Sequence, residues 1–151
     1  MAAPSSPSTP RRAAASKPAR KFSLEQANRS LPYVKRIVAD IVRTHALASS
    51  YRESLEQLAG AKEAAALQKQ LDYSIDRLED LVDELSDVGV ELKDYETGLI
   101  DFVGRHEGRD VYLCWKLGED RITHWHELNA GFAGRKPVSL LKEREKHTKS
   151  S

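Results

Sequence analysis

Two histidines near the end of the chain have a spacing that metal sites use. His124 and His126 flank Trp125 in the run His-Trp-His-Glu, and residues two apart on a strand project to the same face. Zinc sites combine such ligands with a third from elsewhere in the fold, and Asp101 or Glu96 from a neighbouring strand is the candidate. Two alternatives stay open: contact with an anion or small ligand, and histidines that only make structural hydrogen bonds.

Four carboxylates surround the turn that precedes these strands: Glu91, Asp94, Glu96 and Asp101. Converging carboxylates can hold a divalent cation or act as acid and base, although aspartates also favour turns for their local hydrogen bonds. Asp101 differs from the others because it shares a predicted strand face with Leu99 and Val103. A charge that is buried there needs a partner.

A third candidate region contains Trp115, Cys114 and the loop Gly-Phe-Ala-Gly-Arg at 131–135. Trp115 is expected to pack in the core, since large aromatic residues anchor small sheets. Cys114 has no base beside it in sequence, and a thiol needs a lowered pKa to react. The glycines lack the spacing of a phosphate-binding loop, so Arg135 is the residue expected to bind an anion or to pair with a carboxylate.

Two long apolar stripes predict the helices that support these residues. The first runs through Val34, Ile37, Ile41, Thr44, Ala48, Tyr51, Leu55 and Leu58, and the second through Ala64, Leu67, Leu71, Ser74, Leu78, Leu81, Leu85 and Val88. Alternating spacings of three and four are typical of helices that pack side by side. Gly60 and Gly89 end them, and the short connection makes the pair antiparallel.

The start of the first helix is predicted to be interrupted. Ser23 and Gln26 form a capping-box pattern for a short helix from Leu24 to about Arg29. Pro32 is tolerated only in a first turn, so Ser30 is interpreted as a second cap, with the long helix beginning at Leu31-Pro32.

After Gly89 the pattern changes to short strands with short turns, predicted at 99–103, 111–117 and 122–128. The predicted hairpin loop is 106–110, and 129–138 is an extended loop. Such strands form an antiparallel meander of three strands, with the alternation at Val90 and Leu92 allowing a fourth. The predicted fold class is therefore α+β, a long antiparallel helical hairpin followed by a small β-meander.

Composition and charge divide the chain into three parts. The 151 residues are 40% hydrophobic and 31% charged, which suits a folded, helix-rich chain. We expect a disordered arm at 1–21, a single domain at 22–138 with its hairpin at 22–89 and its sheet and loop at 90–138, and a charged tail at 139–151. No apolar run approaches the ~20 residues of a membrane span, and the expected location is cytoplasmic. The single cysteine excludes an internal disulfide and a zinc cage built of cysteines.

Basic charge is concentrated in the arm. It carries Arg11, Arg12, Lys17, Arg20 and Lys21 and no acidic residue, whereas 22–138 has 15 basic and 21 acidic residues, a net charge of −6. Phosphate attraction dominates nucleic-acid affinity, so any contact with nucleic acid or an acidic surface is expected through the arm alone. A transit peptide and a plain solvated tail are the alternatives.

The helices are too long for the sheet to cover. Each has roughly 27 residues, or ~40 Å at 1.5 Å per residue. The outer half of the hairpin, with Tyr51, Leu55, Leu58, Leu67 and Leu71, is therefore expected to pack against a second copy in a dimer with a four-helix arrangement, or against another protein.

Several motifs resemble the bacterial domain of unknown function 2203 (DUF2203) family. They are Phe-Ser-Leu-Glu-Gln-Ala-Asn from Phe22 with Leu31-Pro32, Gly-Val-Glu-Leu-Lys-Asp from Gly89, Gly-Leu-Ile-Asp-Phe from Gly98, Val-Tyr-Leu-Cys-Trp from Val111, Trp-His-Glu-Leu from Trp125 and the loop that ends at Arg135. The resemblance covers about 22–138, and it implies that His126, Glu127 and Arg135 belong to the recurring pattern, whereas His124 does not. It supports the fold and assigns no activity.

Two functions of different classes follow from these observations. The leading interpretation is a non-enzymatic, oligomerising interaction module with no catalytic residue. The alternative is a site on the sheet for a small ligand or a divalent metal, which could also be catalytic. It would be formed by Asp101, His126, Glu127 and Arg135, with Glu96 and Trp115 behind them. Its metal ligands would be Asp101, His126 and Glu127, and no other cofactor is indicated.

Overall fold

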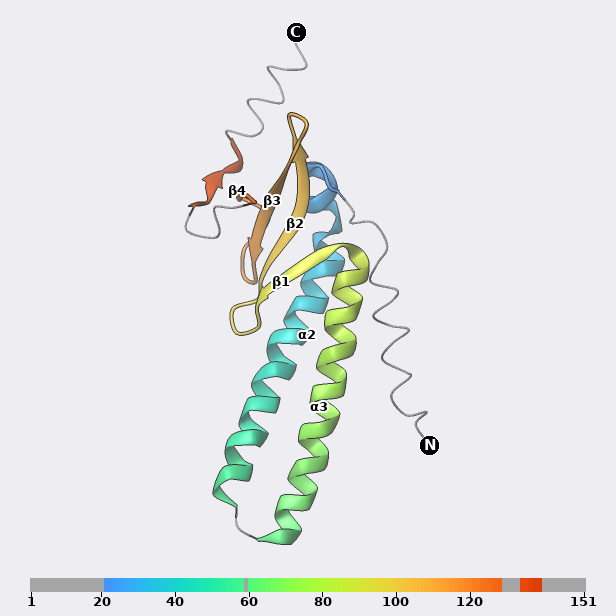
Figure 1. The fold of residues 1–151 in the computed structure, drawn as a ribbon, viewed down its shortest axis with the longest axis vertical. Coiled ribbons are helices and arrows are strands. Elements are labelled where there is room, and N and C mark those ends of the chain that lie inside the picture. Colours follow the sequence, from blue (N-terminus) through green and yellow to red (C-terminus); the bar gives the residue numbers. More distant parts are fainter. Residues whose placement is uncertain (1–20, 59, 129–133, 140–151) are drawn as a thin grey trace.

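Two long helices form a hairpin that carries a small antiparallel sheet (Figure 1). The computed structural model describes residues 21–58, 60–128 and 134–139. Its elements are α2 (Leu24–Gln57), α3 (Ala61–Val88), β1 (Val90–Asp94), β2 (Leu99–His106), β3 (Arg109–Lys116), β4 (His124–Glu127) and β5 (Lys136–Pro137). The predicted α+β fold class is confirmed.

The first helix does not break where the sequence predicted. α2 is continuous through Pro32, so the separate helix at 24–29 and the second cap at Ser30 are wrong. The Ser30 hydroxyl instead donates to the Ala27 carbonyl within the helix, at 2.8 Å. Proline removes one backbone hydrogen bond, but buried residues lie on both sides of it. Their packing against the core outweighs the local preference.

Of the other predicted helix-terminus signals, Ser23 with Gln26 and Gly89 are confirmed, whereas Gly60 is not the end of the first helix: α2 ends at Gln57 with Leu58 as its C-cap, and Gly60 is the N-cap of α3. Ser23 and Gln26 form a reciprocal capping box at the start of α2. Gly89 ends α3 in the left-handed conformation, with φ 103°, and its N–H bonds to the last turn. β1 begins at the next residue, so the helix end also determines where the sheet starts.

Within the described residues the sheet has five strands in the order β1-β2-β3-β4-β5, where three were predicted with a fourth allowed at Val90 and Leu92. β1 is that fourth strand, and the two-residue β5, which lies in the predicted loop 129–138, is additional. The β2–β3 connection is a two-residue turn at Glu107 and Gly108 rather than the predicted loop 106–110, because both residues adopt positive φ. β4 is shorter than the predicted strand 122–128.

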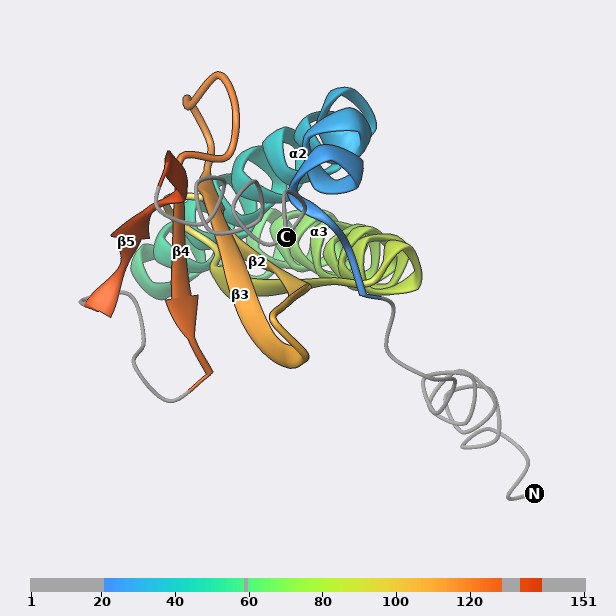
Figure 2. The ribbon, with the colours of Figure 1, turned by 90° about the horizontal axis from the view of Figure 1, so that it is seen from above.

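One face of the sheet packs on the hairpin. Side chains alternate between the faces of a strand, and Ile100, Phe102, Leu113, Trp115 and Trp125 share one core cluster with residues of α2 and α3. The view along the hairpin shows the sheet lying across one end of the two helices (Figure 2). The opposite side of the sheet, here called the outer face, carries the remaining strand residues.

Gly98 lets the β1–β2 turn approach α2 closely. Its φ is +72°, and a Cβ there would lie 2.9 Å from Val38 Cγ1 and 2.9 Å from Leu117 Cβ. Any side chain would push the turn away from the helix. This glycine therefore helps to hold the sheet at its place on the hairpin.

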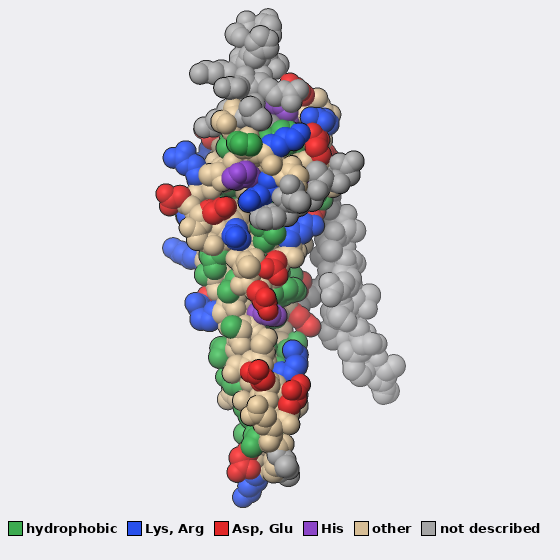
Figure 3. All heavy atoms as spheres, turned by 90° about the vertical axis from the view of Figure 1, so that its left-hand side faces the viewer, with side chains coloured by type: hydrophobic (Ala, Val, Ile, Leu, Met, Phe, Trp, Pro, Cys, Tyr) green, Lys and Arg blue, Asp and Glu red, His purple; other side chains and the backbone are tan. Residues whose placement is uncertain are grey.

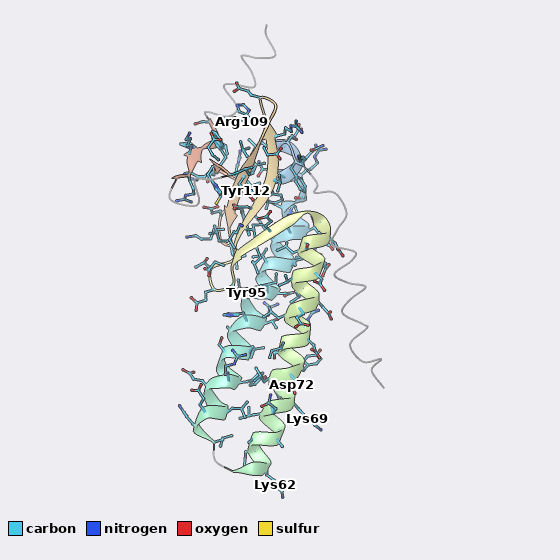
Figure 4. All side chains as sticks on the ribbon, in the orientation of Figure 1. Lys62, Lys69, Asp72, Tyr95, Arg109 and Tyr112 are labelled. Atoms are coloured by element: carbon cyan, nitrogen blue, oxygen red, sulfur yellow. The ribbon has the colours of Figure 1, made fainter. Side chains whose placement is uncertain are left out.

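The core covers only part of the helices. Its helical members end at Val42 on α2 and begin at Leu78 on α3. Beyond them the hairpin continues as a two-helix projection, here called the shaft and comprising 44–57 of α2 and 61–77 of α3. Lys62, Lys69 and Asp72 mark its α3 side, away from the sheet (Figure 4).

Within the described residues, no helix is both long enough and apolar enough to cross a membrane. The predicted basic arm lies outside the described residues except for Lys21, whose ammonium group is 3.2 Å from Asp110 Oδ2. The tail from 140 onward also lies outside them. The predicted contact of the arm with nucleic acid or an acidic surface stays a prediction.

Candidate functional site

The outer face of the sheet holds a buried cluster of three groups that can bind metal. Asp101 on β2 pairs in register with Cys114 on β3, and His126 on β4 pairs with Tyr112. The carboxylate, thiol and imidazole groups offer ligand atoms that lie within 4.8 Å of one another. We call Asp101, Cys114 and His126 the outer-face triad; the three residues are only 3%, 2% and 4% exposed.

Asp101 and His126 are in direct contact. His126 Nε2 lies 3.2 Å from Asp101 Oδ2, and His126 Nδ1 lies 2.8 Å from the backbone oxygen of Glu127. The other carboxylate oxygen, Asp101 Oδ1, is buried and has no hydrogen-bond partner in the described part of the chain. Burial raises the pKa of Asp101 above its ordinary value, against the opposing influence of His126 and Lys93.

The thiol of Cys114 is held in its protonated form. Burial and the neighbouring Asp101 carboxylate raise its pKa to about 12, and the positive charge of Arg135 only partly opposes them. Catalytic cysteines need the reverse, a lowered pKa and an adjacent base. Here the histidine is turned toward Asp101 and the backbone, so the arrangement favours a ligand over a nucleophile.

Tyr112 packs over the imidazole side of the triad. Its ring centroid lies 5.1 Å from that of His126, and Lys93 Nζ lies 5.5 Å from the tyrosine ring. Lys93 also pairs with Glu91 at 2.9 Å. Burial, followed by the charge of Glu91, raises the pKa of Tyr112. Tyr112 lies in the upper part of the molecule with the sheet, well away from the shaft (Figure 4).

The structure separates other predicted site residues from this cluster. Glu127 pairs with Arg109 at 3.0 Å and lies 4.0 Å from Lys136, because adjacent strand residues point to opposite faces. Trp115 is fully buried in the core, and its indole N–H donates to the Glu119 carbonyl at 3.1 Å. Of the predicted metal ligands Asp101, His126 and Glu127, the structure brings the first two together.

Arg135 and His124 lie near the triad in different ways. The positive charge of Arg135 lowers the pKa of Cys114, so this predicted residue acts electrostatically on the triad. His124 pairs in register with Cys114, but its Nδ1 contacts the Thr123 hydroxyl at 2.9 Å. His124 is not part of the group of converging ligand atoms.

Glu96 belongs to a different feature, a groove of about 490 Å³ between the β1–β2 turn and α2. Glu53, Glu56 and His45 line it from the helix. Tyr95, labelled at this turn in Figure 4, packs against His45 with ring centroids 5.2 Å apart and the rings tilted by 32°. Of the four carboxylates predicted around this turn, Glu96 lines the groove and Glu91 pairs in register with Asp101 on the outer face. Asp94 belongs to neither, because its carboxylate accepts hydrogen bonds from the backbone and hydroxyl of Thr97 within the turn.

Cys114 is the residue of the triad that sequence reasoning left out of the site. The signal was present in the alternation of β3, because a core position for Trp115 requires the opposite face for Cys114. The pairing register was also needed, and it depends on the length of the β2–β3 turn.

A comparison with protein families places the whole described fold within one of them. The model of a family described as an uncharacterized conserved protein, DUF2203, matches residues 20–138. No curated protein and no solved structure matches the chain. The matched range contains both helices, all five strands and the outer-face triad, and the chain belongs to the DUF2203 family.

Proposed function

We propose that the protein is a non-enzymatic interaction module that self-associates through the shaft of its helical hairpin. The observation that supports this proposal is the incomplete burial of the seam, by which we mean the apolar stripes of α2 and α3 along the shaft. Ala48 and Leu71 are buried between the helices, but Tyr51, Leu55 and Leu67 are only half-buried, and Leu58 is 36% exposed. Two helices alone cannot enclose such a seam, whereas four can.

A second copy is the occupant that best suits this seam. The shaft has a net charge of only −1, so two copies repel each other little. Its four basic residues are Arg52, Lys62, Lys69 and Arg77, and its five acidic residues are Glu53, Glu56, Glu63, Asp72 and Asp76. Apolar and charged side chains alternate along its surface (Figure 3). A twofold pairing would bury the same half-exposed residues from both copies.

The test is the molar mass of the full chain in solution, measured by light scattering at micromolar concentration. The expected result is a dimer for the wild type. Leu55→Asp and Leu67→Asp should each weaken association at least about tenfold. Burying the exposed part of either leucine, about a third at most, is worth ~0.5–1 kcal/mol per copy, and the new charge adds to the loss. Leu71 is a poorer choice because it is 6% exposed and its loss would also disturb the hairpin.

The matched control is Leu128→Asp, which places the same charge on a leucine that is 52% exposed at the end of β4, outside the hairpin. It should leave the dimer unchanged, and circular dichroism should show the same helix content for every variant. A wild-type protein that is strictly monomeric at these concentrations contradicts the proposal.

A ligand site around His126 is the second candidate function. It is favoured by the buried contact of His126 with Asp101, whose other carboxylate oxygen has no hydrogen-bond partner among the described residues. Arg135 would support it by adding positive charge near Cys114. Elemental analysis of protein purified without chelator or histidine tag tests it, because less than about a tenth of an equivalent of any transition metal argues against a tight metal site.

A further inference from the structure

The hydrogen bonds of His126 restrict what can lie between its ring and Asp101. A backbone carbonyl only accepts, so the close contact with the Glu127 oxygen requires that His126 Nδ1 carries a proton and donates it. In a neutral ring, Nε2 is then an acceptor, and it faces the carboxylate oxygen of Asp101 at 3.2 Å. Two acceptors face each other in this way only when a proton or a metal cation lies between them.

The third group of the triad favours a metal cation. Cys114 brings a thiol to the same place, with all three ligand atoms within 4.8 Å, and Asp101 Oδ1 is buried and has no partner within the described chain. Without metal, one proton satisfies the pair of facing acceptors, and the thiol adds only a weak hydrogen bond to Asp101. A metal ion satisfies the imidazole nitrogen, the sulfur and one or both carboxylate oxygens.

We propose that Asp101, Cys114 and His126 together bind one divalent ion of the zinc class. The inference rests on the second candidate function, a ligand site around His126, and it deepens that candidate by naming the ion and replacing Glu127 with Cys114. Each ligand comes from a different strand, β2, β3 or β4, so the ion ties three neighbouring strands together.

The donor set identifies the class of ion. Zinc combines sulfur, nitrogen and oxygen ligands at ~2.0–2.3 Å in a tetrahedron, which places the ligand atoms ~3.3–3.8 Å apart. The Asp101–His126 separation of 3.2 Å already approaches this spacing, and rotation of the thiol can bring Cys114 closer. Calcium and magnesium prefer oxygen ligands alone. The second oxygen of Asp101, or a water molecule, completes the four ligands.

Charge and outer contacts also fit zinc. Binding displaces the thiol proton and the proton shared by Asp101 and His126, so a thiolate, a carboxylate and a neutral imidazole surround the ion and the buried site is electrically neutral. Zinc-bound histidines usually donate their other ring N–H to a carbonyl or carboxylate, as His126 does to Glu127. The low exposure of all three ligands indicates a structural ion rather than one that meets a substrate.

The experiment titrates Co²⁺, as a spectroscopic substitute for zinc, and then Zn²⁺ into the full chain after removal of metal with a chelator. The expected result is one equivalent of either ion, a thiolate-to-cobalt charge-transfer band in the near ultraviolet, and a higher Tm with zinc. Cys114→Ser should abolish the band and the rise in Tm. It should also weaken zinc binding at least ~100-fold, because loss of an outer contact alone costs ~10–100-fold.

Two control variants separate this ligand set from its neighbours. His124→Gln removes the other histidine of β4, and Glu127→Gln removes the carboxylate that pairs with Arg109. Both should retain the wild-type band and the zinc-dependent rise in Tm. Circular dichroism of metal-free Cys114→Ser shows whether that variant is folded, and the band in the wild type reports on the thiolate without any variant.

The experiment distinguishes failure of the ligand site around His126 from failure of the zinc site that includes Cys114. Cobalt binding that depends on His126, tested with His126→Gln, but shows no thiolate band would overturn the role of Cys114 and leave the ligand site standing. No binding of zinc or cobalt to the wild type would overturn the metal site in both forms. Zinc or cobalt binding that is lost in Glu127→Gln but kept in Cys114→Ser, at unchanged helix content, would restore Glu127 as a ligand in place of Cys114.

Discussion

The state of Cys114 depends on its burial beside Asp101. Without metal, the thiol has a pKa of about 12, because burial opposes the charged thiolate and the carboxylate repels it. Burial and the negative charge of Asp101 prevent Cys114 from reacting as a thiolate. The same burial and charge favour a cation that binds both side chains. One residue can therefore be inert toward electrophiles and yet be a ligand once a divalent ion supplies the compensating charge.

The raised pKa predicts a loss of stability at alkaline pH in metal-free protein. The pKa of the thiol is 9.0 in a free chain and about 12 in the folded protein. Between these values the unfolded chain has released a proton that the folded chain still holds, so the free energy of unfolding falls as pH rises, by up to ~1.4 kcal/mol per pH unit. Below pH 9.0 the thiol contributes no such slope.

Urea unfolding of the metal-free wild type and of Cys114→Ser, measured across the lower half of this window, checks the prediction. Tyrosine and lysine residues titrate in both proteins, so the difference between the two curves isolates the thiol. The wild type should lose stability more steeply than the serine variant. Parallel curves would show that the thiol ionises in the folded protein as it does in the free chain.

At the scale of elements, the helix start shows how a short local signal anchors a long structure. The Ser23 hydroxyl accepts from the Gln26 N–H at 3.1 Å, and the Gln26 side chain accepts from the Ser23 N–H at 3.0 Å. These contacts satisfy helix-start amides that would otherwise have no partner. Phe22, just before the cap, packs edge-on against Phe102 of the sheet, with ring centroids 5.1 Å apart. The cap therefore links α2 to the core.

Ser23→Ala should lower the free energy of unfolding by about 1 kcal/mol, because it removes the N-cap acceptor. Ser50→Ala, at an exposed position within α2, is the matched control and should be neutral or slightly stabilising, since alanine is the better helix former. Chemical denaturation of both variants gives the comparison. Equal effects would mean that the cap contributes nothing beyond helix propensity.

The strand register decides the composition of the candidate site. A five-residue loop at 106–110 would pair Arg105 with Val111 and therefore Asp101 with Trp115. The two-residue turn at Glu107 and Gly108 instead pairs Asp101 with Cys114. Residues that pair directly share a face, and a shift of one residue exchanges the faces of a whole strand. The identity of the third ligand thus follows from the length of one turn.

At the scale of the whole molecule, the core and the shaft are distinct. All core residues contributed by the helices lie in 24–42 or 78–88, close to the sheet. The shaft is stabilised mainly by contact between α2 and α3. It contains four of the five residues of the predicted self-association surface, and the fifth, Leu58, is the C-cap residue of α2. The two candidate functions accordingly occupy different ends of the protein.

This separation predicts that the shaft can be shortened without loss of the fold. Replacing 48–71 with a short glycine-rich turn removes matching lengths of both helices and leaves the core intact. The product should be a folded monomer that still binds one equivalent of zinc. Light scattering, circular dichroism and the cobalt band check the three parts of this outcome. A shortened protein that remains dimeric would place the self-association surface elsewhere.

The sequence by itself determined the hairpin, its capping box, its final glycine and the presence of a sheet after it. These features follow from periodicity and from contacts between residues a few positions apart. Only the tertiary structure decided that α2 continues through Pro32, that Cys114 lies opposite Asp101, and that Glu127 turns to Arg109. Each of these depends on packing or pairing between distant segments, where a buried contact or a shift of one residue outweighs the local preference.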